Sequence, residues 1–592
     1  MVSSPLWFGA DERRLFGWVH TPPAPEGVRA SLVICPSMGL EAGFSHFVLR
    51  NVADELAARG FLVVRFDYDG TGDSAGSGGD PDRVSAWRES VRNAVQLARS
   101  IADVPVALLG MRIGAILATY EAEAMGGADA LVLWDPPRSG RSFIREQRTR
   151  QSVTFGEADG AVPTFTAVGM NFSEETVAEL STLDLRRFHR LPAAKCLVVE
   201  RTGRRVFARD LEGRGDAAAT VIEADDQDDL LLRQMEPRKT MRSVVGWLEG
   251  AFAQQQLVKA NLSVLEIDGT RALTVPAAPE AGVNVHERLV DLGPRHLFGV
   301  LSEPAGTPTG PVIVFVPDAH TPHVGLSRMW VDLARSWSSK GARVLRFDLS
   351  GSGDSDVRPG VEPHRVALVE HIEDVNDVAR AISPQDPSDV VFIGICSGAY
   401  LTLESALELG PRGICVLNPV FSFITAERPV DRRRRAMQRT RTTLNALFGR
   451  AIGRAAHRIS PVLRFEGGFD WSRWFEAGYW QRSIVRRGWN LPEPVWRLLN
   501  GLMLSRRPAD VLQEIVRNGT DVYIIAGDPD HEHVVVGGRK RLARMERGSR
   551  LRIDYLPGLD HSVLKAGMRE RVMALLTEHV ESRLLQDPVD PA

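Results

Sequence analysis

The chain has 592 residues, of which 44% are apolar and 25% charged, and its formal net charge is −3. That length exceeds what one hydrophobic core usually organises, so we expect two or more domains. The small net charge gives no global electrostatic case for binding nucleic acid. No apolar run is long enough to cross a membrane, and the first residues lack the pattern of a signal peptide. We therefore expect neither a membrane span nor a cleaved leader.

The four cysteines are far apart in the chain and include no CxxC pair. This spacing predicts neither a disulfide framework nor a zinc site, and a reducing cytoplasm is the expected location. Three of them, Cys35, Cys196 and Cys415, lie in apolar, strand-like runs and are predicted to be buried core residues. The fourth is Cys396.

Five segments recur in the same order along the chain, which predicts two copies of one domain. As many residues separate Pro36 from Arg65 as separate Pro317 from Arg346. The five pairs are residues 14–25 with 296–306, 31–43 with 312–325, 62–76 with 343–357, 106–118 with 391–403, and 130–137 with 414–420.

Each copy alternates short apolar runs with amphipathic stretches. In the first copy the runs at 32–35, 62–66, 107–109 and 131–134 are predicted to be buried parallel strands. Stretches such as "HFVLRNVADELAARG" are typical of the helices between them. The alternation predicts an α/β fold, with a mostly parallel sheet flanked by helices in each copy.

The repeat and the linker composition suggest the domain plan. We expect a first domain at 1–256, a connector with a short strand at 257–285, and a second domain at 286–582. The second domain has a large insertion, expected to be a cap, at about 421–515. Residues 583–592 are expected to be a tail.

The stretch "FIGICSGAY", residues 392–400, resembles the nucleophile elbow of the α/β-hydrolase superfamily, and the resemblance covers both copies. Gly394 and Gly398 frame Cys396 as the nucleophile. Centring the elbow on Ser397 would put Ile395 where the turn needs a small residue. The other interpretation of Cys396 is a small buried residue in an inactive elbow.

In that superfamily the acid and the histidine follow the nucleophile in sequence. The matching positions here are His561, in "LPGLDHSVL", and Asp530, in "AGDPDHEH", with Asp528 as the alternative acid. The resemblance thus implies a catalytic triad of Cys396, His561 and Asp530.

An oxyanion hole would complete such a site. The backbone N–H of Ser397 is expected to supply one donor, because this residue follows the nucleophile. The second donor is expected from the "VPDAH" loop, at Ala319 or Asp318.

The first copy lacks all three catalytic residues. Arg112 stands at the nucleophile position, Gln227 or a neighbour replaces the histidine, and the late strand of residues 195–205 carries no aspartate. A guanidinium is neither nucleophile nor base, so we expect an inactive domain. Arg112 would either bind an anionic group in the old pocket or pair with an acid such as Asp135. The segments "GMRIGA" and 169–185 resemble hydrolase-like proteins encoded with exopolysaccharide and exosortase systems.

Two further patterns are expected to be structural. The repeated "RFDxxGxGDS" at 65–74 and 346–355 has the wrong spacing for a dinucleotide fingerprint, and we expect a turn after a central strand. Four histidines lack the spacing of a metal-binding helix, so we predict no metal and no cofactor. They are His320, His323, His531 and His533.

The expected cap is strongly basic in its first part and rich in tryptophan in its second. Such a surface could receive an anionic, partly apolar partner, such as an acyl-coenzyme A, an acyl carrier protein or a lipid-linked sugar phosphate. The alternative is a solvated helix face whose tryptophans pack on the core. The five tryptophans are Trp471, Trp474, Trp480, Trp489 and Trp496.

These observations predict an acyl-transfer enzyme with a thioester intermediate on Cys396. The donor would be an ester, an acyl-coenzyme A or an acyl carrier protein, and the acceptor water, a small molecule or a glycan. Polysaccharide or secondary-metabolite biosynthesis is a possible setting, and transfer and hydrolysis are both open. A cysteine elbow also resembles those of polyhydroxyalkanoate synthases and dienelactone hydrolases. The rival hypothesis is a non-catalytic binding or scaffold protein built from two degenerate domains.

Overall fold

The computed structural model forms two compact units, one of residues Met1–His364 with Ser562–Ala592 and one of residues Arg365–His561. The cap is expected at about 421–515, and all of it up to residue 506 lies outside the described residues, as do 277–282 of the connector and 586–592 of the tail. The predicted domain bounds stay a prediction. The described residues are 2–23, 27–155, 165–167, 169–203, 206–212, 219–227, 236–267, 270–276, 283–318, 321–359, 369–419, 507–528, 530–535, 538–548 and 550–585.

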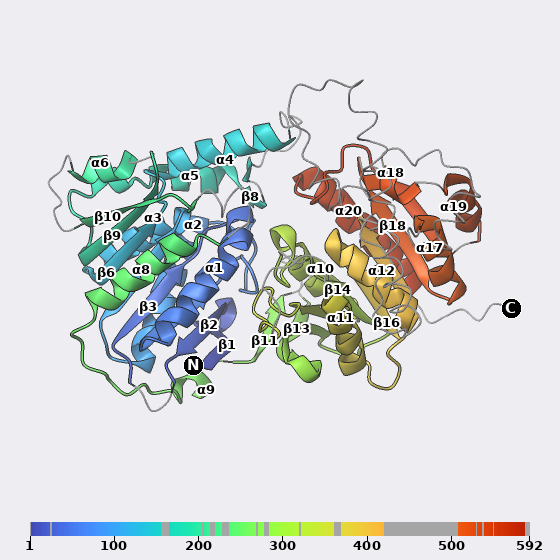
Figure 1. Ribbon diagram of the computed structural model, residues 1–592, viewed down its shortest axis with the longest axis horizontal. Coiled ribbons are helices and arrows are strands. Elements are labelled where there is room, and N and C mark those ends of the chain that lie inside the picture. Colours follow the sequence, from blue (N-terminus) through green and yellow to red (C-terminus); the bar gives the residue numbers. More distant parts are fainter. Residues whose placement is uncertain are drawn as a thin grey trace, which may run out of the picture. The chain divides into compact units, whose positions relative to one another are not determined.

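The N-terminal region of the larger unit is built on a sheet with the strand order β1-β2-β4-β3-β5-β6-β9-β10 (Figure 1). β2 pairs antiparallel with β1 and β4, and the other neighbours pair in parallel. The four strands predicted for this region are present as β3 to β6. The bounds are β1 Val2–Phe8, β2 Leu15–Thr21, β3 Ala30–Cys35, β4 Phe61–Phe66, β5 Val106–Met111, β6 Ala128–Trp134, β9 Ala193–Arg201 and β10 Ala219–Ala224.

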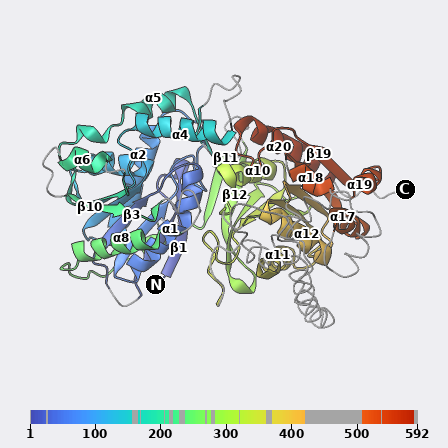
Figure 2. The same ribbon diagram turned by 45° about the horizontal axis from the view of Figure 1, so that its top comes forward.

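Helices cover both faces of this sheet, and the strands are apolar on both sides. Leu32 and Ile34 of β3 pack in a core with α1 and α8, whereas Val33 and Cys35 pack in a second core with α2 and α3. Figure 2 shows the helices from another side. The bounds are α1 Leu40–Ala57, α2 Arg83–Ile101, α3 Ile113–Ala124, α4 Gly140–Phe155, α5 Glu174–Thr182, α6 Val206–Glu212, α8 Arg238–Ala251 and α9 Val264–Ile267, with a hairpin of β7 Phe165–Ala167 and β8 Met170–Phe172.

The larger unit also holds the first strands of the C-terminal region, in the order β11-β12-β13-β15-β14. These strands pair antiparallel except for β14 and β15, which are parallel. β11 lies within the predicted connector. The bounds are β11 Ala272–Pro276, β12 Asn284–Leu292, β13 Leu297–Pro304, β14 Val312–Val316, β15 Arg343–Phe347, α10 Met329–Ser338 and α20 Ala566–His579.

The smaller unit contains four parallel strands in the order β16-β17-β18-β19. α12 packs on β16 and β17, and α11 packs on α12. Each region of the chain thus has a mostly parallel sheet flanked by helices, as the sequence predicted. The bounds are β16 Val390–Ile395, β17 Gly413–Leu417, β18 Asp521–Ala526, β19 Leu551–Tyr555, α11 Val369–Ile382, α12 Ser397–Leu409, α17 Pro508–Arg517, α18 Asp530–Val535 and α19 Arg539–Glu546.

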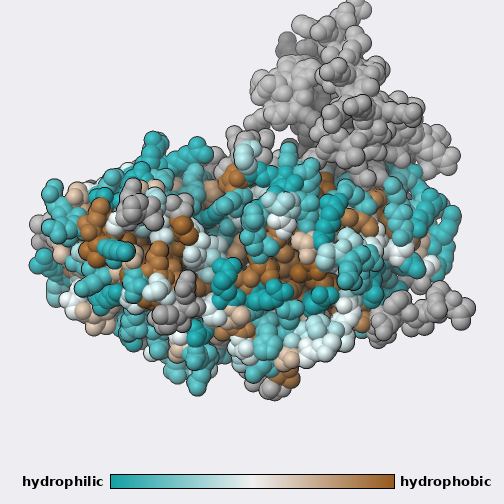
Figure 3. All heavy atoms as spheres, turned by 90° about the horizontal axis from the view of Figure 1, so that it is seen from below, coloured by the Kyte–Doolittle hydropathy of each residue, from teal (hydrophilic) through white to brown (hydrophobic). Residues whose placement is uncertain are grey.

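The described surface mixes hydrophilic residues with scattered hydrophobic ones on the face shown in Figure 3. Among the described helices, none is both long and apolar enough to span a bilayer.

Candidate active site

Cys396 stands in a sharp turn between the end of β16 and the start of α12. Its φ of 54° and ψ of −116° are a backbone conformation that side-chain-bearing residues adopt at strain. A Cβ on Gly394 would lie 2.5 Å from the carbonyl oxygen of Gly398, so only glycine fits there. The thiol therefore projects from a strained strand-to-helix turn, which is the geometry of a nucleophile elbow.

The smaller unit brings His561 and Asp530 to this thiol. His561 Nε2 lies 3.1 Å from Cys396 Sγ, and His561 Nδ1 lies 2.8 Å from Asp530 Oδ2. Asp530 is the first residue of α18 and is 5% exposed. The alternative acid, Asp528, instead accepts hydrogen bonds from the Tyr555 hydroxyl and the Gly558 N–H.

These contacts change the proton affinity of the imidazole. Hydrogen bonds to Asp530 and to Cys396 raise the pKa of His561 to about 10, against the opposing effect of burial. At neutral pH the imidazole therefore holds its proton. That is the state reached after a thiol has given its proton to the ring.

Asn418 fixes the loop that carries His561, and the sequence patterns did not reveal it. Its side-chain amide donates to the backbone carbonyls of Asp560 and His561, at 3.0 and 2.8 Å, and its Oδ1 accepts from Gly527 N–H at 2.9 Å. The residue follows β17, is fully buried and has a φ of 43°. Asparagine tolerates that left-handed conformation better than most residues, so its presence right after a strand was the available signal.

Of the two predicted oxyanion donors, Ser397 and Ala319, only Ser397 is among the described residues. Ser397 is the first residue of α12 and is buried. Ala319 lies outside the described residues. The alternative, Asp318, uses its carboxylate to accept from the N–H and hydroxyl of Thr321, at 2.9 Å each.

The N-terminal region has the same elbow with a different residue. Arg112 has a φ of 55° and a ψ of −122° between β5 and α3. Its guanidinium is buried and bonds to Glu41 at 3.2 Å, Asp135 at 3.2 Å and Glu146 at 2.7 Å. Burial alone would lower the pKa of Arg112, but the three carboxylates raise it. Arg112 thus pairs with acids, including the predicted Asp135, and fills the position with a structural ion cluster.

In the N-terminal region, the residues at the positions of the catalytic histidine and acid also make structural contacts. Gln227, which follows β10, is buried and accepts a hydrogen bond from the Trp134 indole N–H at 2.8 Å. At the end of β9, Arg201 donates to Asp135 at 2.7 Å. Neither residue can take a proton from a nucleophile.

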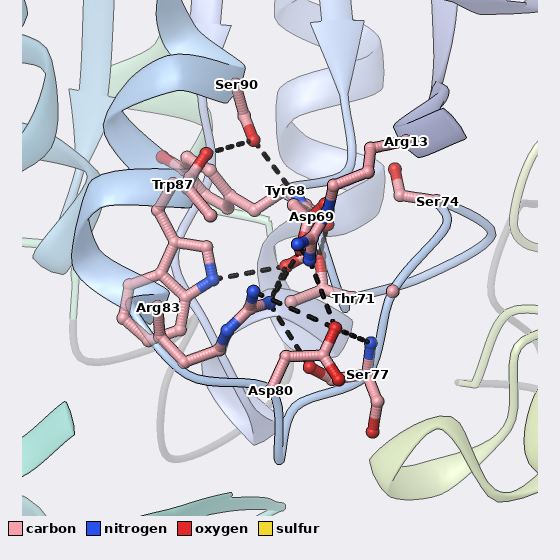
Figure 4. A network of polar contacts seen from close by, with 12 residues as sticks. Arg13, Tyr68, Asp69, Thr71, Ser74, Ser77, Asp80, Arg83, Trp87 and Ser90 are labelled. Carbon is pink, nitrogen blue, oxygen red and sulfur yellow. Dashed lines mark hydrogen bonds and ion pairs between the residues drawn. The ribbon is translucent and has the colours of Figure 1, made fainter. Parts of the chain in front are cut away.

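The "RFDxxGxGDS" segment of the N-terminal region forms a turn after β4, as predicted (Figure 4). The carboxylate of Asp69 accepts from Arg13 and from Arg83, at 2.7 and 2.6 Å. A Cβ on Gly72 would lie 1.9 Å from the carboxylate of Asp67, so the tight turn requires glycine. Of the four histidines that lack the spacing of a metal-binding helix, His323 contacts two aspartates of such segments, and His320 lies outside the described residues.

Fold and elbow geometry together define an α/β-hydrolase type of protein, and comparison of the sequence with family models agrees. Residues 313–574 match the Alpha/beta hydrolase family, and residues 27–142 match the Serine aminopeptidase, S33 family. Each of these two regions is thus similar in sequence to a family of α/β hydrolases. No curated protein matches the chain in sequence.

Solved structures resemble parts of the chain only weakly. An a/b serine hydrolase without lid from Xanthomonas campestris is 17% identical, with 43% of this chain and 94% of that chain covered and a TM-score of 0.29. Est1E from Butyrivibrio proteoclasticus is 14% identical, over 42% and 99%, with a TM-score of 0.32. Proline iminopeptidase from Mycobacterium smegmatis is 14% identical, over 42% and 99%, with a TM-score of 0.31. Likenesses at this level say nothing of the chain's substrate.

Proposed function

We propose that the C-terminal region is an acyl-transfer enzyme with Cys396 as nucleophile, His561 as acid and base, and Asp530 as the group that orients the imidazole. The observation that carries the proposal is the chain of contacts from Sγ to Nε2, at 3.1 Å, and from Nδ1 to Oδ2, at 2.8 Å. These distances are within reach for proton transfer, and the acid holds the ring so that Nε2 faces the sulfur.

The first half-reaction acylates the thiol. The proton of the thiol is held on Nε2 of His561 at the start, and the thiolate attacks the acyl carbon of an ester or thioester. Backbone N–H groups, of which Ser397 would supply one, stabilise the resulting oxyanion. The bond to the leaving group then breaks, and the leaving group takes the proton from His561. The acyl group remains on Cys396 as a thioester.

The second half-reaction returns the enzyme to its starting state. Water, an alcohol or an amine gives a proton to His561 and attacks the thioester carbon. Sγ leaves as a thiolate, and the proton stays on the imidazole, which restores the starting pair. An acyl-coenzyme A, an acyl carrier protein or a simple ester would supply the acyl group, and a small molecule or a glycan would accept it. A cytoplasmic location belongs to this proposal, and the four free cysteines are consistent with it.

We further propose that the N-terminal region is a catalytically inactive copy of the same domain. Five segment pairs in the same order support the duplication. The matching backbone conformations of Arg112 and Cys396 also support it. The buried ion cluster on Arg112 leaves no nucleophile in that copy, so the region would act through binding or stability. The resemblance to exopolysaccharide-associated proteins is part of the same proposal.

A p-nitrophenyl butyrate reaction, stopped with acid and read by intact mass, tests the proposal. The wild-type chain should gain one butyryl group, Cys396→Ala should gain none, and His561→Ala should react more slowly. Cys35, Cys196 and Cys415 serve as internal controls, because all three are buried. An unmodified wild-type chain, or an equal adduct on Cys396→Ala, would favour the non-catalytic alternative.

A further inference from the structure

A cavity of about 520 Å³ lies in the larger unit, at the carboxyl ends of β3 and β4. Its size is within the range of small-molecule sites. Five aromatic side chains are among the residues that line it. They are Phe16, Trp18, Phe44, Phe66 and Tyr68.

The carboxylate of Asp67 borders this cavity and can accept more hydrogen bonds than the described residues donate to it. It follows β4, borders the cavity, and receives one side-chain hydrogen bond among the described residues, from the N–H of Asp73 to Oδ2 at 3.0 Å. A carboxylate surrounded by protein normally gathers several donors. The remaining capacity of Asp67 is directed at the cavity.

In the C-terminal region, the aspartate that corresponds to Asp67 accepts several hydrogen bonds from the protein. There Asp348 follows β15, and three donors serve its carboxylate: His323 N–H at 2.7 Å, the His323 ring at 2.9 Å and Asp354 N–H at 2.8 Å. Ala42 stands as far before Asp67 as His323 stands before Asp348, and it lines the cavity. An alanine cannot donate from its side chain, so the N-terminal region has a cavity and an open acceptor at the corresponding position.

The cationic residues of the wall are already engaged by the protein. Arg328 donates to the carbonyls of Gly72, Ser74 and Gly76. Arg65 donates to Asp354 and to a histidine, and the third arginine of the wall, Arg569, donates to Asn171 at 3.3 Å. These guanidinium groups therefore do not neutralise Asp67.

We propose that the cavity is a second ligand site, which binds a small organic amine. The apolar body of the ligand would lie against the aromatic wall, and its ammonium group would donate to Asp67. An ammonium ion supplies both the donors and the positive charge that a carboxylate in this position lacks. The site is separate from the proposed chemistry at Cys396 and does not rest on it.

The charge state of Asp67 makes binding depend on pH. Burial and the nearby charge of Asp73 raise the pKa of Asp67 to about 6, while His46 and His323 act in the opposite direction. Below pH 6 the carboxyl is protonated and no longer attracts an ammonium ion. Affinity for an amine should therefore fall by about tenfold between pH 7.5 and pH 5.

Isothermal titration with 2-phenylethylamine tests this site, with 2-phenylethanol as the neutral probe of the same shape. The full chain should bind the amine saturably and more tightly than the alcohol, and Asp67→Asn should weaken amine binding by at least tenfold while leaving alcohol binding unchanged. Asp11→Asn is the matched control, because it removes the same charge from a side chain that is 86% exposed. Ala42→Leu fills the cavity without touching Asp67 and should weaken both probes.

Thermal unfolding of each variant checks that it is folded. The proposal is overturned if neither probe binds, if amine and alcohol bind the wild-type chain equally, or if folded Asp67→Asn binds the amine as the wild type does. Butyrylation of Cys396 in the same variants keeps the two proposals distinguishable, because the cavity variants should leave it unchanged.

Discussion

Arg65 donates a hydrogen bond to Asp354 over 2.8 Å, and this buried contact joins the two "RFDxxGxGDS" segments of the chain. The reverse contact is also present, because Arg346 of the second segment pairs with Asp73 of the first. The arginine of each segment thus neutralises the last aspartate of the other. Such reciprocity is the pattern of an isologous interface between two copies of one domain.

Asp73→Asn should destabilise the chain strongly. Asp73 neutralises both Arg346 and His323, and all three side chains are buried. Arg346 keeps Glu287 and His323 keeps Asp348, but the buried cluster loses one negative charge, and removing one partner of a buried ion pair costs about 3–5 kcal/mol. Urea unfolding of the full chain measures the change. The exposed pair of Arg187 and Glu123 gives the control, since Glu123→Gln should change stability by less than about 1 kcal/mol.

Asp530→Asn and Asp528→Asn form a matched pair for the acid. Asp530 contacts the imidazole and Asp528 contacts Tyr555, so the first substitution should slow butyrylation of Cys396 by roughly 10²-fold or more and the second should change it little. Stopped-flow release of p-nitrophenol gives both rates. Equal losses in the two variants would contradict the assignment of Asp530.

The rate at which iodoacetamide alkylates Cys396 should depend only weakly on pH between 6 and 9. The pKa of His561 is raised to about 10, so the imidazole keeps its proton and its positive charge beside Sγ throughout that range. In His561→Gln the thiol has to ionise unaided, and free thiols do so near pH 8.5, so its rate should rise steeply across the same range. If the alkylation rates of the two proteins depended on pH in the same way, His561 would not be the proton partner of Cys396.

Asn418→Asp should lower kcat by roughly tenfold with little change in KM, because the carboxylate can still accept from Gly527 but no longer donates to the carbonyls that position His561. Asn418→Ala loses both functions and should lose more. A merely structural role would instead lower the melting temperature and leave the kcat of the folded fraction unchanged.

Arg112→Met should destabilise the N-terminal region without touching butyrylation of Cys396. The substitution removes the one cation among the described residues that contacts Glu41, Asp135 and Glu146 together, and leaves Arg150 and Arg201 to face three carboxylates. Losing this partner should cost about 3–5 kcal/mol of unfolding free energy. Burial alone would raise the pKa of Glu146, and the charge of Arg112 lowers it. The variant should therefore recover stability as the pH falls, and urea titrations at pH 5 and pH 7.5 measure this.

The fold was predictable because apolar runs and repeats are local signals. The strands β3 to β6 follow from four such runs, and the elbows follow from glycine spacing. The choice of Asp530 over Asp528 rested on family spacing, and the contacts of the two side chains now separate them.

Two features could not be predicted from the sequence, because they depend on residues far apart in the chain. Arg112 meets Glu41 and Glu146, which no motif links to the elbow. The cavity beside Asp67 is lined by residues from distant parts of the chain, and Ala42 among them carries no pattern of its own.

Because of the reciprocal arginine–aspartate contacts, removing the N-terminal region should destabilise the rest of the chain. A fragment that starts at residue 286 would keep Arg346 and His323 but would lose Asp73. Each of these buried cations would then lose one of its two anions and keep the other, Glu287 for Arg346 and Asp348 for His323. Gene duplication followed by loss of catalysis in one half usually frees that half to be deleted or to diverge. Under the duplication that we propose, the N-terminal region would remain under selection, because its Asp73 pairs with two buried cations of the C-terminal region.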